Sequence, residues 1–126
     1  MELLDELRGR WPVAVASNSP REHLMAGLSR VGLHGRFDAV LGVEEVEEPK
    51  PAPDLYLRSC ELLGVSPPRS LALEDSPPGV AAARAAGLYV VGVPSVAGVV
   101  LEADAVFDSL ASPLVRSTIF AHLGRP

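Results

Sequence analysis

The chain has 126 residues, of which 48% are hydrophobic and 21% charged, with a formal net charge of -5. That length predicts one domain, residues 1–126, with an aliphatic core. The charge argues against a nucleic-acid surface, and no apolar run reaches the roughly 20 residues of a membrane span. The single cysteine, Cys60, excludes an internal disulfide framework. We therefore expect a cytoplasmic protein.

The first third of the chain predicts two helices separated by a strand. A helical segment with a leucine face stops at Gly9, and residues 12–16 form an apolar run of strand length. Ser19 is a good N-cap for the second helix, because Glu22 completes the Ser-x-x-Glu pattern of a capping box. Gly32 ends that helix.

The middle of the chain predicts a strand, an acidic loop and a helix. Residues 37–41 form the strand, and residues 42–48 (GVEEVEE) form a solvated acidic loop. Three prolines surround Lys50, so we expect extended backbone there and no helix. The helix covers residues 53–63.

The last part of the chain predicts strands at residues 70–73 and 89–93, with a helix between them that ends at Gly87. A short strand at residues 105–107 and a final helix reaching His122 follow. Strands of continuous apolar character that alternate with helices indicate an α/β fold. We expect a Rossmann-like parallel sheet with helices on both faces.

Polar residues follow three of these strands, where ligands bind in such folds. Ser17 and Asn18 follow the first strand, Lys50 lies in the loop after the second, and Glu74 and Asp75 follow the third. Ser17 can donate to a phosphoryl oxygen, beside backbone amides that open the next helix and favour an anion. Lys50 can offset phosphoryl charge, and adjacent carboxylates suit Mg²⁺. This order of residues indicates phosphate chemistry.

Three segments resemble motifs of the haloacid dehalogenase-like hydrolases. Residues 13–24 (VAVASNSPREHL) resemble the second motif, residues 50–57 (KPAPDLYL) the third and residues 71–87 (LALEDSPPGVAAARAAG) the fourth. Together they are most similar to the β-phosphoglucomutase-like phosphatase branch, over about residues 3–110. The resemblance implies a Rossmann-like core and Mg²⁺-dependent phosphoryl transfer from a small phosphorylated metabolite through an aspartyl-phosphate.

The resemblance assigns each candidate residue a role. Ser17 and Lys50 are the expected catalytic residues, and both bind phosphate together with Asn18. Glu74 and Asp75 are the expected ligands of the Mg²⁺ cofactor.

The chain departs from the family pattern because it contains no Asp-x-Asp-x-Thr, the first motif, which carries the nucleophile. The resemblance implies that the helical cap and about 80–100 residues of such an enzyme are absent. The strand that bears the first motif would lie mid-sheet, between the strands that end at Ser17 and Glu74. We therefore expect a truncated core that is inactive without its N-terminal half, which could be a separate polypeptide.

Two other interpretations compete with that of an enzyme. The chain could be a non-catalytic phosphate- or Mg²⁺-binding module, or a remnant that forms a homo-oligomer through exposed strand edges. A receiver-like signalling domain is disfavoured, because its acid pair precedes its hydroxyl and lysine. Phosphatase and mutase activities, and the identity of the substrate, stay open at this point.

Overall fold

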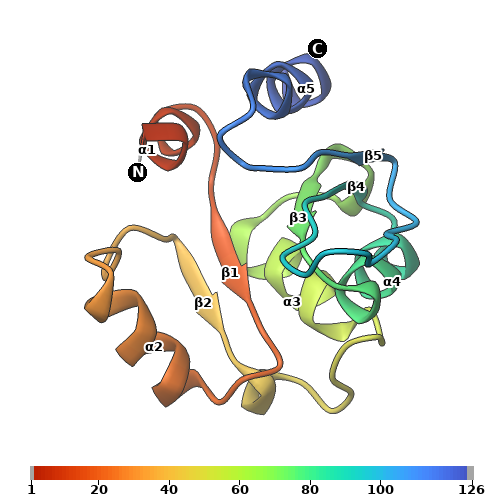
Figure 1. The fold of residues 1–126 in the computed structure, drawn as a ribbon. Helices are drawn as coiled ribbons and strands as arrows, with labels where there is room; N and C mark the ends of the chain where they lie inside the picture. The colour runs from red at the N-terminus through yellow and green to blue at the C-terminus, as the bar shows by residue number, and fades with distance from the viewer. Residues whose placement is uncertain (1, 125–126) are drawn as a thin grey trace.

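The computed structural model describes residues 2–124, so Met1, Arg125 and Pro126 of the predicted domain lie outside the described residues. The elements in chain order are α1 (Glu2–Arg8), β1 (Ala14–Ala16), α2 (Arg21–Arg30), β2 (Ala39–Leu41), the 3₁₀ helix η1 (Val43–Glu45), α3 (Asp54–Leu63), η2 (Pro67–Arg69), β3 (Leu71–Glu74), α4 (Pro77–Ala86), β4 (Tyr89–Gly92), β5 (Ala105–Val106) and α5 (Pro113–Leu123) (Figure 1). The predicted order of helices and strands is confirmed, with two 3₁₀ helices added. In the part of the chain described, no helix combines the length and hydropathy that a membrane crossing requires.

The strands are parallel, as predicted, and the fold is α/β and Rossmann-like. They form two sheets, one with the order β1-β2 and one with the order β3-β4-β5. Val15 lies opposite Val40 in the first sheet, and Ala72 lies opposite Val90 in the second. Strands β1 and β3 are the facing edges of the two sheets, with a break between them (Figure 1).

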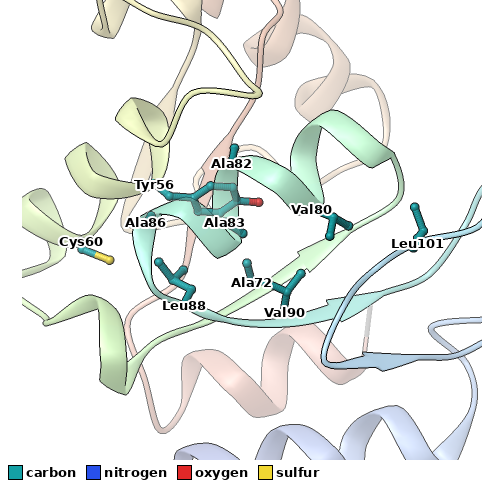
Figure 2. Packing of buried hydrophobic residues seen from close by; sticks show 10 residues of the cluster. All are labelled: Tyr56, Cys60, Ala72, Val80, Ala82, Ala83, Ala86, Leu88, Val90 and Leu101. Atoms are coloured by element: carbon teal, nitrogen blue, oxygen red, sulfur yellow. The ribbon is translucent and has the colours of Figure 1, made fainter.

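Helices α3 and α4 pack against each other and against the sheets. Helix α3 contacts β1 and β2, helix α4 contacts β3 and β4, and helix α5 contacts β3 (Figure 1). The main cluster of buried side chains lies between α3, α4 and the second sheet (Figure 2). Its members are mostly small or aliphatic: Tyr56, Cys60, Ala72, Val80, Ala82, Ala83, Ala86, Leu88, Val90 and Leu101. The alanines let α4 approach the strands closely, and Cys60 of α3 is buried in the same core.

Two local predictions were wrong. Helix α2 begins at Arg21, and Ser19 does not cap it: the N-cap position is Pro20, which makes no side-chain cap. The Arg21 amide instead donates to both carboxylate oxygens of Glu44, at 2.9 and 3.2 Å. Glu44 of the acidic loop therefore caps the start of α2, although it lies 23 residues from Arg21 in the sequence. The backbone at Lys50 lies in a turn rather than an extended segment.

Candidate functional site

The loop after β1 carries Ser17. One residue beyond the end of β1, the Ser17 amide still donates to Leu41 O of β2 at 3.0 Å. Its Oγ accepts from the Ser19 amide at 3.1 Å. The amides of Ser19 and Arg21 are thus both taken by groups of this chain. The anion site expected from the backbone amides at the start of α2 is occupied in part by these internal acceptors.

Asn18 fastens this loop to the loop that bears Lys50. Its Nδ2 donates to Lys50 O at 3.1 Å, and its Oδ1 accepts from the Lys50 amide at 2.8 Å. Both polar atoms of the Asn18 side chain are therefore hydrogen-bonded to the backbone of Lys50, 32 residues away in the sequence. Asn18 holds Lys50 in place, and its expected phosphate contact stays a prediction.

The Lys50 ammonium lies between the carboxyl ends of β1 and β3. Its Nζ donates to Ala16 O at 2.9 Å and to Glu74 Oε2 at 2.6 Å. The side chain of Lys50 is 11% exposed and that of Glu74 is 7% exposed, so this ion pair is largely withdrawn from water. In such surroundings an ion pair is retained only when further hydrogen bonds complete it.

Tyr56 supplies one of those further bonds. It lies on the buried face of α3, and its hydroxyl donates to Glu74 Oε2, the oxygen that also binds Lys50. The Lys50 ammonium also lies 5.0 Å from the centroid of the Tyr56 ring. Burial, followed by the negative charge of Glu74, raises the pKa of the Tyr56 phenol, which therefore stays a hydrogen-bond donor.

Gly79 makes room for the Glu74 carboxylate. A Cβ atom added at Gly79 would lie 1.8 Å from Glu74 Oε1 and 2.2 Å from its Cδ. The first turn of α4 therefore passes directly over this carboxylate, where no side chain fits. Glu74 is enclosed by Lys50, Tyr56 and the backbone of Gly79.

Asp75 differs from its neighbour because it is exposed. Its Oδ2 accepts from Ser95 Oγ, in the loop after β4, at 3.2 Å. Mg²⁺ takes few carboxylates, together with water and phosphate oxygens, so Asp75 fits it as one ligand. Glu74 fits it less well, because its Oε2 is bound by Lys50 and Tyr56. Residues 2–124 contain no cluster of three His, Cys, Asp or Glu side chains that could hold a metal ion.

The candidate residues meet at one end of a cavity. Ser17, Lys50, Glu74 and Asp75 line a cavity of about 500 Å³ between β1 and β3, together with Tyr56. Asn18 bonds to the Lys50 backbone and is not among the lining residues. One ammonium and two carboxylates give this end a formal charge of -1. A phosphate dianion is therefore repelled here unless a divalent cation joins Asp75.

Tyr56, Gly79 and Ser95 were not predicted as parts of the site. Tyr56 has the spacing of an ordinary core residue of a helix, and Gly79 looks like a glycine next to helix-opening prolines. Neither pattern shows that both residues meet the same carboxylate. Ser95 lies 20 residues from Asp75 in a loop without a motif.

The chain matches a family model over residues 1–87, described as hydrolase, haloacid dehalogenase-like hydrolase. It is 33% identical over 113 residues to the validoxylamine A 7'-phosphate phosphatase of Streptomyces hygroscopicus subsp. limoneus, covering 87% of this chain and 53% of the relative. It is 38% identical over 93 residues to the fructose-1-phosphate phosphatase YqaB of Escherichia coli (strain K12), covering 74% of this chain and 50% of the relative. The chain therefore spans about half the length of these two curated relatives.

Solved structures show the same fold. CbbY of Rhodobacter sphaeroides, in complex with phosphate, matches with a TM-score of 0.79 and 33% identity over 86% of this chain and 51% of that one. A β-phosphoglucomutase of Clostridium difficile matches with a TM-score of 0.81 over 98% of this chain and 56% of that one, and at 23% identity this likeness concerns the fold alone.

Proposed function

The chain belongs to the haloacid dehalogenase-like hydrolases, and from that premise we propose that it carries the phosphate- and metal-binding part of a phosphohydrolase acting on a small phosphate monoester. The observation that carries the proposal is the convergence of Ser17, Lys50 and Asp75 at one end of a single cavity. A hydroxyl, an ammonium and an exposed carboxylate are the groups that phosphoryl transfer uses.

Each residue takes a role that follows from its contacts. Lys50, held by Glu74 and Ala16 O, places a fixed positive charge where phosphoryl charge develops. Ser17 Oγ donates to a phosphoryl oxygen, because its contact with the Ser19 amide uses the oxygen as an acceptor and leaves the hydroxyl proton free to point outward. Asp75 is a ligand for Mg²⁺, which when bound offsets the phosphate charge and aligns its oxygens.

The names of the relatives support a phosphorylated small molecule as substrate. Validoxylamine A 7'-phosphate and fructose 1-phosphate both carry a phosphate monoester on a polyhydroxylated carbon skeleton. We propose this class of substrate for the protein that contains this chain, whether as a phosphatase or as a mutase.

The nucleophile is the part that residues 1–126 do not supply. The sequence contains no Asp-x-Asp-x-Thr, and no base lies within hydrogen-bond distance of Ser17 Oγ among the described contacts. Since covalent phosphoryl transfer needs an activated nucleophile, we propose that residues 1–126 bind phosphate with Mg²⁺ but turn over little or none of it.

The test separates binding from turnover. Calorimetry with inorganic phosphate should show binding that requires Mg²⁺ and that Lys50→Met and Asp75→Asn abolish. Arg69→Met is the matched control, because Arg69 is a cation of the same cavity outside the Ser17–Lys50–Asp75 cluster. Hydrolysis of para-nitrophenyl phosphate with Mg²⁺ should stay at background. Robust turnover that Asp75→Ala abolishes would contradict the proposed inactivity, and phosphate binding equal in all variants would contradict the site.

A further inference from the structure

The loop that follows β4 begins beside the candidate site. The Val93 amide donates to Glu74 O at 2.8 Å, and Glu74 lies opposite Gly92 in the parallel register of β3 and β4. Because parallel strands end at the same edge of a sheet, the residues after β4 leave the sheet next to those after β3. Ser95 therefore lies close to Asp75, although 20 residues separate them in the sequence.

Packing further along the same loop fixes its course. Leu101 belongs to the main buried cluster and is 6% exposed (Figure 2). A Cβ atom added at Gly92 would lie 2.9 Å from Leu101 Cδ1, so the returning part of the loop lies directly on the end of β4. Arg84 of α4 adds a hydrogen bond from its Nη1 to Glu102 O at 2.9 Å. The loop that carries Ser95 is therefore anchored at its beginning and at its end.

The Ser95 hydroxyl holds the Asp75 carboxylate from outside the cavity. Ser95 Oγ donates to Asp75 Oδ2 at 3.2 Å. Asp75 lines the cavity of about 500 Å³, whereas Ser95 is not among the lining residues. A carboxylate can accept through both of its oxygens, and within residues 2–124 the second oxygen of Asp75, Oδ1, accepts no hydrogen bond. Oδ1 is therefore available to a metal ion while Oδ2 is held.

The two adjacent acids differ in what restrains them. Glu74 is buried, and its Oε2 is bound by Lys50 and Tyr56. Asp75 is exposed, and in the part of the chain that the structure describes its carboxylate is hydrogen-bonded by Ser95 alone. A free side chain loses rotational freedom when it is immobilised by a ligand. A hydrogen bond that restricts the Asp75 carboxylate beforehand reduces this loss.

We propose that Ser95 is a positioning residue, which fixes the Asp75 side chain in the rotamer that presents Oδ1 to Mg²⁺. The proposal rests on the proposed function, because it takes Asp75 as the metal ligand. Ligating carboxylates in proteins are themselves hydrogen-bonded, and loss of such a partner weakens metal binding by about 10–100-fold. Ser95 and Asp75 are both exposed, so water competes for this bond, and we expect an effect of about tenfold.

The first experiment measures the Asp75 rotamer by NMR without any metal. Couplings from the backbone nitrogen and carbonyl carbon of Asp75 to its Cγ report the χ1 angle. One rotamer should dominate in wild type and in Ser95→Thr, which keeps the hydroxyl, whereas Ser95→Ala should show rotamer averaging. Ser109→Ala is the matched control, because the Ser109 hydroxyl is also exposed and hydrogen-bonded, to the Ala111 amide in the loop before α5. The Asp75 couplings should not change in this control.

The second experiment measures Mg²⁺ binding by calorimetry on the same variants. Ser95→Ala should bind Mg²⁺ about tenfold more weakly than wild type, whereas Ser95→Thr and Ser109→Ala should bind it as wild type does. Asp75→Asn should not bind it. Because Ser95 is exposed, Ser95→Ala should leave the urea midpoint unchanged, which separates weaker binding from lower stability.

The outcomes distinguish failure of this inference from failure of the proposed function. Loss of Mg²⁺ binding in Asp75→Asn but not in Ser95→Ala would overturn the positioning role alone. Averaged couplings of Asp75 in the wild-type chain, or equal couplings in wild type and Ser95→Ala, would also overturn that role alone. Equal results for wild type and Asp75→Asn in calorimetry, including no binding by either, would overturn Asp75 as the metal ligand and the role of Ser95 with it.

Discussion

Replacing Gly79 with alanine should destabilise this protein, although alanine favours helices. On helix propensity alone, a glycine-to-alanine change within a helix stabilises by up to about 1 kcal/mol. The new Cβ, however, would lie 1.8 Å from Glu74 Oε1, so the carboxylate must move. Overpacking costs about 1–3 kcal/mol, and weakening a charge-assisted hydrogen bond costs about 1.5–3 kcal/mol. After the gain in helix propensity is subtracted, the expected net loss in the free energy of unfolding is about 1.5–5 kcal/mol.

Urea denaturation followed by Trp11 fluorescence measures this loss. Gly27→Ala is the matched control, because Gly27 lies within α2 and a Cβ there meets nothing within 4 Å. That variant should be more stable by about 0.5–1 kcal/mol. If Gly79→Ala stabilises the chain as Gly27→Ala does, then Glu74 does not occupy the position on which the site depends.

A double-mutant cycle identifies the group responsible. In a Glu74→Ala background the clash is removed, so Gly79→Ala should become neutral or stabilising by up to about 1 kcal/mol. A change of sign between the two backgrounds assigns the cost to the Glu74 carboxylate. An equal cost in both backgrounds would refute the steric argument.

Three further predictions concern neighbouring groups. Tyr56→Phe should lower the free energy of unfolding by about 1.5–3 kcal/mol, because Glu74 loses a buried donor. Since the pKa of Tyr56 is raised from its ordinary value of 10.0, the stability from the protonated phenol is complete below that pH and is lost as the pH rises above it. As the pH is raised above 10.0, the urea midpoint of the wild type should fall more steeply than that of Tyr56→Phe. Parallel dependences of the two midpoints on pH would contradict this. Asp104→Ala should lower the free energy of unfolding by about 1–3 kcal/mol in urea denaturation, because Asp104 Oδ2 accepts from the Val90 amide at 2.7 Å. An unchanged midpoint would show that water replaces this carboxylate. Asp75→Asn should change the free energy of unfolding by less than about 0.5 kcal/mol, because Asp75 is exposed. The same change should abolish Mg²⁺ binding in calorimetry, and retained binding would exclude Asp75 as a ligand.

The parts of the fold that depend on local patterns could be predicted from the sequence. Strands β1, β3 and β4 follow from short apolar runs, and the αL conformation that ends α3 and α4 falls on Gly64 and Gly87. The meeting of Ser17, Lys50, Glu74 and Asp75 at one edge follows from the parallel topology, because parallel strands end at the same edge.

Contacts between distant segments could not be predicted. Ser19 has the local pattern of an N-cap, but a carboxylate from Glu44 reaches the Arg21 amide and replaces it. Hydrogen bonds from the backbone amides of Glu44 and Arg21 hold the pKa of the Glu44 carboxyl below its ordinary value, so it remains an acceptor at neutral pH. Glu74 was expected to face a metal ion, and its partners Lys50 and Tyr56 lie 24 and 18 residues away in the sequence. Which acid of an adjacent pair is buried depends on this tertiary packing.

The break in the sheet also bears on how the chain folds and opens. Strands β1 and β2 flank α2, and strands β3 and β4 flank α4, so each pair forms within a short stretch of sequence. Units with local contacts form quickly and can open separately. Lys50 and α3 connect the two units, since Lys50 bonds to Ala16 O in one and Glu74 in the other. The same ammonium that charges the candidate site therefore bonds to both of these units.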